Sequence, residues 1–242
     1  MDDDRYSAYI VSRRGSKPHA SRRTQRRRSH RAAGLLITVL LILTAVICLL
    51  VFFLPKLTSP TGADTAIDFG GRTFYLLATA KTDERVAAEL QAKSAADRGG
   101  AGYVYNDGSY NIIAALYERE SDAKTLVTVN QDSYYFALSV PAVACGEGDK
   151  RALDFITGEL CATLSELAVD LDRGNITEAA AEHAVSVAMN KTAEIALGVE
   201  NERLHAALTE TIESSHPTDR SVLSGVRFIQ VQAIVAVREI YV

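Results

Sequence analysis

Tryptophan is absent from the chain, cysteine is scarce, and no enzyme motif is present. The 242 residues include three cysteines and five histidines, and their spacing does not match a zinc site. No Gly-x-Ser-x-Gly turn, His-Glu-x-x-His pair or phosphate-cradling glycine loop occurs. These absences argue against a hydrolase, a zinc peptidase and a nucleotide-binding enzyme. We therefore expect a non-enzymatic protein with no cofactor and no metal.

Charge and proline are both missing from residues 33–54, AGLLITVLLILTAVICLLVFFL. A helix of about 22 residues reaches about 33 Å, enough to cross a hydrocarbon core of about 30 Å. A signal peptide has a shorter apolar core and a small-residue cleavage site, and a core helix would carry a polar stripe. The sequence therefore predicts an uncleaved transmembrane helix over 33–54.

Basic residues dominate the segment before that helix, although the whole chain has a net charge of −4. Residues 1–32 hold ten basic residues and three aspartates. Positive charge beside a span stays in the cytoplasm, so we expect a single-pass cell-membrane protein with its amino terminus inside and its carboxyl-terminal part extracytoplasmic. The arm lacks the patterning of nucleic-acid readers. It predicts a disordered cytoplasmic segment that attracts membrane lipid, with no nucleic-acid partner.

Strand and helix patterns alternate after a linker at 55–71, which is rich in proline, glycine, serine and threonine. The patterns predict, in order, a strand at 72–79, a helix from Thr82 to Gly99-Gly100, strands at 102–106 and 109–117, a helix at 118–130 and a strand at 133–140. This order predicts an α+β fold over 72–141, a βαββαβ two-layer sandwich of four antiparallel strands with two helices on one face. Its second face would be bare, and exposed apolar faces usually bind a partner.

Two strands of this segment resemble the SPOR domain, the sporulation-related repeat of bacterial cell-envelope proteins. Residues 74–80 read Phe-Tyr-Leu-Leu-Ala-Thr-Ala, where that family has an aromatic-Val-Gln-Val-Gly-Ala-Phe strand. Residues 110–117 read Tyr-Asn-Ile-Ile-Ala-Ala-Leu-Tyr, where the family has Tyr-Arg-Val-x-Val-Gly-Pro-Phe. The chain departs from the family at positions that bond sugars: Leu76 replaces glutamine and Asn111 replaces arginine.

SPOR domains have a βαββαβ fold of the RNP-like type. They bind the glycan strands of peptidoglycan and gather at division septa. The resemblance therefore implies a peptidoglycan-binding or septum-localising protein of cell division or sporulation, alongside other envelope or divisome proteins. Strand alternation and the family match place the candidate glycan-binding residues on the bare face: Phe74, Leu76, Tyr103, Tyr105, Asn111 and Ile113. The alternative is an extracytoplasmic protein-interaction scaffold that has lost glycan binding.

Helical periodicity begins after Lys150 and predicts a helical domain over 149–242. One amphipathic helix ends at Gly174-Asn175, a second follows Thr177 and is interrupted at Gly198, and a third covers about 221–241. The third has charged residues that argue against a second span. Its wide apolar surface predicts burial either between neighbouring helices or against another chain. In the second case the chain would form a homo-oligomer through the carboxyl-terminal helices.

Cys145 and Cys161 are the cysteines that follow the predicted span. An oxidising exterior would permit a disulfide between them. The sequence leaves both the paired and the free state open.

Overall fold

The computed structural model describes residues 66–129, 132–215 and 219–242. All described residues belong to one compact unit, Asp64–Val242. The predicted basic arm at 1–32, the predicted transmembrane helix at 33–54 and most of the predicted linker lie outside the described residues.

Across the described ranges, no helix combines the length and the apolar character that crossing a membrane requires. The predicted fold class counted a single transmembrane helix as its first element, and it is wrong in that respect for the part of the chain that the structure describes. The described unit is an α+β fold that contains a four-stranded sheet, a two-stranded sheet and several helices.

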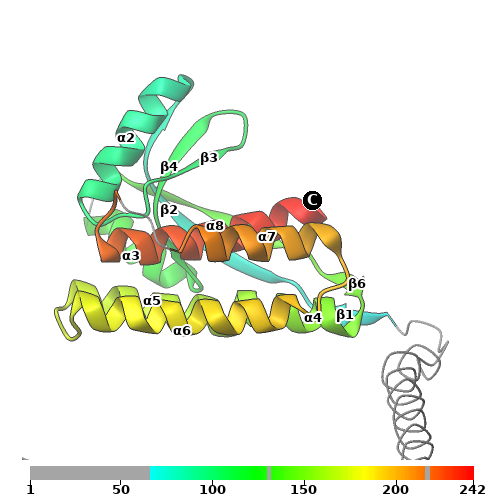
Figure 1. The fold of residues 1–242 in the computed structure, drawn as a ribbon. Coiled ribbons are helices and arrows are strands. Elements are labelled where there is room, and N and C mark those ends of the chain that lie inside the picture. Colours follow the sequence, from blue (N-terminus) through cyan, green and yellow to red (C-terminus); the bar gives the residue numbers. More distant parts are fainter. Residues whose placement is uncertain (1–65, 130–131, 216–218) are drawn as a thin grey trace, which may run out of the picture. The chain divides into compact units, whose positions relative to one another are not determined.

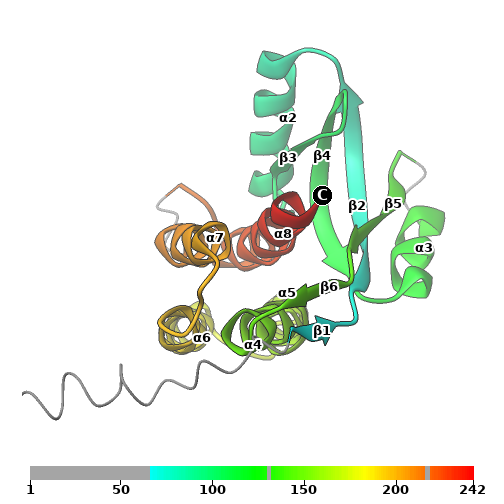
Figure 2. The same cartoon turned by 90° about the vertical axis from the view of Figure 1, so that its right-hand side faces the viewer.

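The four-stranded sheet is antiparallel throughout and has the strand order β3-β4-β2-β5. Figure 1 shows β2, β3 and β4 near α2, and Figure 2 labels all four strands. A separate pair, β1 with β6, is also antiparallel. The elements along the chain are β1 (Ile67–Phe69), β2 (Arg72–Thr82), α2 (Arg85–Asp97), β3 (Tyr103–Asn106), β4 (Tyr110–Tyr117), α3 (Glu120–Val129), β5 (Tyr134–Val140), β6 (Val143–Cys145), α4 (Glu147–Asp154), the π-helix η1 (Phe155–Leu160), α5 (Cys161–Asp172), α6 (Glu178–Ala196), α7 (Glu202–Glu213) and α8 (Val222–Tyr241).

Helix α2 packs on the sheet through small side chains. Ala88, Ala92 and Ala95 recur at helical spacing and form a small buried cluster with Ile112 of β4. Thr82 stabilises the turn that precedes α2, because its Oγ1 accepts a hydrogen bond from the backbone N–H of Glu84 at 3.2 Å. Register shifts in the β2–β4 ladder mark irregularities of the kind that increase strand twist.

Helix α8 covers the opposite face of the sheet, so the prediction of a bare second face is wrong. Ile113 and Tyr105 alternate along their strands with residues that face α2, and both belong to the core that includes the α8 residues Val231 and Val235. Figure 2 shows α8 and α3 on opposite sides of the sheet. The wide apolar surface of α8 is therefore buried within the chain itself, between the sheet and the helices α5 and α7.

Three arginines, two on α8 and one two residues before it, hold this segment against the sheet side of the molecule. Arg227 Nη1 donates to the carbonyl oxygen of Gly99 at 2.7 Å. Arg238 Nη1 donates to the hydroxyl of Tyr105 at 2.8 Å, and Arg220 Nη1 donates to the carbonyl of Ala101. Hydrogen bonds from a charged donor contribute about 1.5–3 kcal/mol each, so these contacts fix the position of α8 along the sheet as well as its distance from it.

The helices after β6 pack as a group beside α8, as the end-on view in Figure 2 shows. The helix predicted to begin at Lys150 is α4, η1 and α5 in succession, and the π-turn of η1 interrupts its regular hydrogen bonding. Arg72, the first residue of β2, donates to the carbonyl of Thr157 within η1 at 2.9 Å. The π-turn is thereby bonded to the sheet.

A buried carboxylate fixes the turn between α6 and α7. Asp149 Oδ1 accepts hydrogen bonds from the backbone N–H groups of Glu200 and Asn201, at 2.9 and 3.1 Å. The side chain of Asn201 then caps α7 by accepting from the amides of Arg203 and Leu204. Gly198, which the sequence suggested as an interruption, lies between α6 and α7.

One hydrophobic core extends across the sheet and the helices. It includes Phe74 of β2, Leu164 of α5, Leu208 of α7 and Ile234 of α8, all at most 1% exposed. The segments predicted as separate domains, 72–141 and 149–242, therefore share their core within one compact unit.

Replacing Gly102 with alanine should lower the free energy of unfolding by about 2 kcal/mol or more. Gly102 has a φ of 58°, and a Cβ there would lie 2.4 Å from the carbonyl oxygen of Ala92. Urea denaturation measures the change. Gly70→Ala is the matched control, because a Cβ at Gly70 meets nothing within 4 Å, and equal midpoints for the two variants would contradict the prediction.

Candidate functional site

The residues predicted to bind glycan lie mostly in the interior. Phe74, Leu76 and Ile113 are at most 1% exposed, and they belong to the core beneath α8. Tyr105 is also buried, and its ring stacks on Phe136 with centroids 5.7 Å apart. These side chains are brought together on one sheet face, as the alternation predicted, but that face has no open surface at their positions.

Asn111 is a structural residue of the same face. Its amide nitrogen donates to Asp107 Oδ1 at 2.8 Å and to the carbonyl of Ser109 at 3.1 Å. Its oxygen accepts a hydrogen bond of 2.6 Å from the hydroxyl of Tyr134. Buried polar groups need such partners. Asn111 is 2% exposed, so its side chain closes the hairpin between β3 and β4 and is not available to a ligand.

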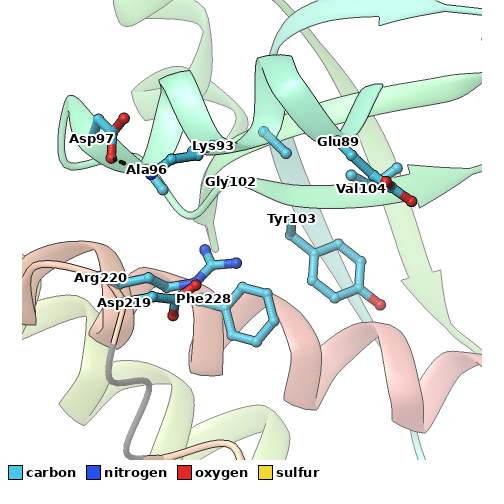
Figure 3. Close-up of a pocket in the computed structure, with 11 residues that line it drawn as sticks. Glu89, Lys93, Ala96, Asp97, Gly102, Tyr103, Val104, Asp219, Arg220 and Phe228 are labelled. Carbon is cyan, nitrogen blue, oxygen red and sulfur yellow. Dashed lines mark hydrogen bonds and ion pairs between the residues drawn. The ribbon is translucent and has the colours of Figure 1, made fainter. Parts of the chain in front are cut away.

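Tyr103 differs from the other predicted residues because it lies beside an open hollow. The hollow, which we call the α2–α8 cleft, has a volume of about 450 Å³. Figure 3 shows α2 on one side, β3 behind and the start of α8 on the other side. Its lining residues are Glu89, Ala92, Lys93, Ala96, Asp97, Gly102, Tyr103, Val104, Asp219, Arg220 and Phe228.

Two aromatic rings lie side by side in the cleft. The centroids of Tyr103 and Phe228 are 5.6 Å apart with an interplanar angle of 49°, a separation typical of favourable aromatic pairs. The guanidinium of Arg220 lies over the Phe228 ring, 4.2 Å from its centroid, and cation–π attraction holds it there. Burial is the main cause that raises the pKa of Tyr103 to about 12, and the negative charge of Glu239 adds to it.

Charged groups of both signs surround the rings. Glu89 of α2 pairs with Arg85 at 2.9 Å, and Lys93 pairs with Asp97 at 3.4 Å. These pairs are exposed and contribute little to stability. Burial lowers the pKa of the Arg220 guanidinium, and the charge of Asp219 partly opposes that shift. The cleft therefore offers carboxylate acceptors, cationic donors and aromatic carbon within one small hollow.

Sequence reasoning missed Phe228 and Arg220. Phe228 stands among the apolar residues of α8, and its sequence pattern is that of any other core position. Arg220 precedes the helix by two residues and has no motif around it. Both join Tyr103 only because α8 returns to the sheet more than one hundred residues later, so no local signal identifies them.

The cysteines after the predicted span are both free. Cys145 is half-buried and Cys161 is buried, so the alternative of a disulfide between them does not apply to this structure. The carboxamide of Gln230 donates to the carbonyl of Cys161 at 3.2 Å. Over the described ranges, no group of three or more histidine, cysteine or acidic side chains is placed to hold a metal ion.

Comparison with known proteins identifies no relative of this chain. No protein family, no curated protein and no solved structure matches it. The site is therefore interpreted from its own geometry.

Replacing Asn111 with alanine should destabilise the fold by about 1–3 kcal/mol, because the buried hydrogen bonds that its carboxamide makes within the β3–β4 hairpin and with the part-buried hydroxyl of Tyr134 are lost. Thermal unfolding of the purified chain measures the loss. Tyr134→Phe is the control, since it removes one hydroxyl and leaves the other bonds of Asn111 in place. A wild-type melting temperature for Asn111→Ala would contradict a structural role.

Alkaline pH should destabilise the protein, and Cys161 and Tyr103 are two of the groups that cause it. Burial raises the pKa of the Cys161 thiol to about 12 from 9.0 and that of Tyr103 to about 12 from 10.0. The folded state favours the protonated forms of both groups. Their contribution to the free energy of unfolding is therefore fully present below about pH 9 and is lost as the pH rises toward about 12. Urea midpoints across this window should fall less steeply for a Cys161→Ala, Tyr103→Phe double variant than for the wild type; parallel slopes would contradict the assignment.

Proposed function

We propose that the described unit is a non-enzymatic binding module, and that the α2–α8 cleft binds a sugar. The expected class is the glycan of peptidoglycan. The observation that carries the proposal is the pairing of the Tyr103 and Phe228 rings within a hollow that also presents charged hydrogen-bonding groups. Ligand sites commonly combine an apolar wall with a few polar groups that fix orientation.

Sugars suit both parts of this surface. A pyranose ring has an apolar face that packs on aromatic carbon, and its hydroxyls need donors and acceptors. Glu89, Asp97 and Lys93 on α2 lie opposite the rings, as Figure 3 shows. These polar side chains project from a helix that packs on the sheet through its buried alanines. The cleft therefore has a fixed aromatic side and a side of adaptable polar groups.

The resemblance of the strands to SPOR domains supports the same ligand class but a different position. In the predicted site the ligand would lie on the sheet face, which α8 occupies in this structure. In the proposed site it lies at the β3 edge, where Tyr103 is the residue common to both. A glycan-binding module of this kind would bring the protein to sites of cell-wall synthesis in division or sporulation.

A protein-interaction scaffold is the second candidate, and one observation favours it. Val86 and Leu90 lie one helical turn apart on α2 and are 70% and 67% exposed. Neighbouring exposed apolar side chains are typical of surfaces that bind another protein. This pair lies on the same helix as the polar side of the cleft, so the two candidates predict different effects of variants in α2.

Phe228→Ala should weaken binding of the full chain to amidase-treated peptidoglycan about tenfold, because one aromatic contact contributes about 1.4 kcal/mol. Co-sedimentation over a range of peptidoglycan concentrations measures the affinity. Tyr75→Ala is the matched control, since Tyr75 forms an aromatic pair with Tyr135 outside the cleft.

The proposal fails if the wild type does not sediment with the treated peptidoglycan, or if both variants bind as the wild type does. Val86→Ser with Leu90→Ser tests the second candidate. Under the glycan proposal this variant retains its affinity for the treated peptidoglycan, and a loss equal to that of Phe228→Ala would contradict binding in the cleft.

A further inference from the structure

Strand β5 forms one end of the four-stranded sheet. It pairs with β2 on one side, and within the described chain no strand pairs with its other side. In an antiparallel strand, alternate residues direct their N–H and C=O groups toward each side. The outer side of β5 therefore presents a row of backbone donors and acceptors that another strand would satisfy.

The usual protections of an edge strand are missing from β5. Its sequence, YYFALSV, contains no charged residue and no proline. Its ladder with β2 runs from Arg72↔Val140 to Ala78↔Tyr134 without a register shift. Natural proteins normally place lysine, proline or a bulge on such an edge to prevent pairing. The other edge strand, β3, is only 4 residues long and lies beside the cleft.

The strand also complements itself. A two-fold axis through Ala137, the middle of the seven residues, pairs Phe136 with Leu138 of a second copy and Tyr135 with Ser139. All seven residues then lie opposite a residue whose side chain is on the same face of the sheet. Leu138 and Val140 are 2% exposed within their own chain, so the side-chain contacts across the axis come from the other face, on which Ala137 and Ser139 are exposed. Since β5 has no charged residue, the two copies meet without like-charge repulsion.

Helix α3 adds apolar surface beside this edge. It contacts β5, and its N-terminal Glu120 accepts a hydrogen bond of 2.9 Å from the hydroxyl of Tyr135. Leu126 and Val129 of α3 are 37% and 79% exposed. Under the two-fold axis, both copies of α3 lie on the same face of the joined sheet, so these side chains lie on the surface next to the partner.

We infer that the chain forms a symmetric dimer by antiparallel pairing of β5 with β5 of a second copy, about Ala137. The partner is a second copy because the seven residues contain no charge and no proline and their ladder has no register shift, so two copies meet without like-charge repulsion and without a missing backbone donor. The joined sheet has β3 at both ends. This interface differs from the one predicted through the carboxyl-terminal helices, since α8 is buried within its own chain. It leaves the α2–α8 cleft open in each copy, so it is independent of the proposed ligand.

Cysteine cross-linking tests both the interface and its register. Ala137 would lie directly opposite its own copy, with the two Cα atoms about 4.5–5.5 Å apart, within the range of a disulfide. Ser139 is exposed on the same face, but the two copies of Ser139 would be about 13 Å apart. We expect Ala137→Cys to form a covalent dimer under a mild oxidant, and Ser139→Cys to remain monomeric on a non-reducing gel.

The parent for both variants is the full chain with Cys48→Ser and Cys145→Ser, with the buried Cys161 left in place. Cross-linking of both variants, of neither, or of Ser139→Cys alone would overturn the inference. Light scattering gives an independent measurement. Ala137→Lys places two like charges opposite each other and should give monomers, whereas Ser139→Lys, which faces Tyr135 of the partner, should remain dimeric; equal masses for the two lysine variants would also overturn it.

Discussion

The packing of α8 against the sheet is the contact on which the rest of the described unit depends. Eleven of its 20 residues are buried, and they join the strands to α5, α6 and α7 in one core. Burying apolar surface provides most of this stabilisation, at about 25 cal/mol per Å². That term has no direction, so by itself it would not fix how far α8 slides along the sheet.

Hydrogen bonds from arginine side chains fix the position of α8 along the sheet. The carbonyl groups of Gly99 and Ala101 accept bonds from Arg227 and Arg220, and both carbonyls belong to the short connection between α2 and β3. Gly99 and Gly102 have positive φ values in this connection, which suit glycine. The same contacts place Arg220 over Phe228, so the geometry of the cleft follows from the way α8 is held.

Patterns in the sequence located many of the individual elements between residues 72 and 140, because strands and helices have different side-chain periods. The alternation of Phe74 and Leu76 against Tyr75 also placed the right residues together on one face. The prediction that this face is exposed was wrong, because α8 buries it. A buried apolar face and an exposed ligand-binding face have the same alternation, and the distinction lies in a helix that begins at Val222.

By itself the sequence determined local structure: the alanine face of α2, the cap at Thr177, the break near Gly198 and the apolar character of α8. These features depend on neighbours within a few residues, so composition and spacing are sufficient. Only the tertiary structure decided what covers the sheet, which residues line the cleft and which strand edge stays unpaired. Each of these features joins segments far apart in the chain. The burial of apolar surface that joins them has no direction, so many arrangements would satisfy it. Specific hydrogen bonds, such as those of Arg227 and Asn111, select one arrangement.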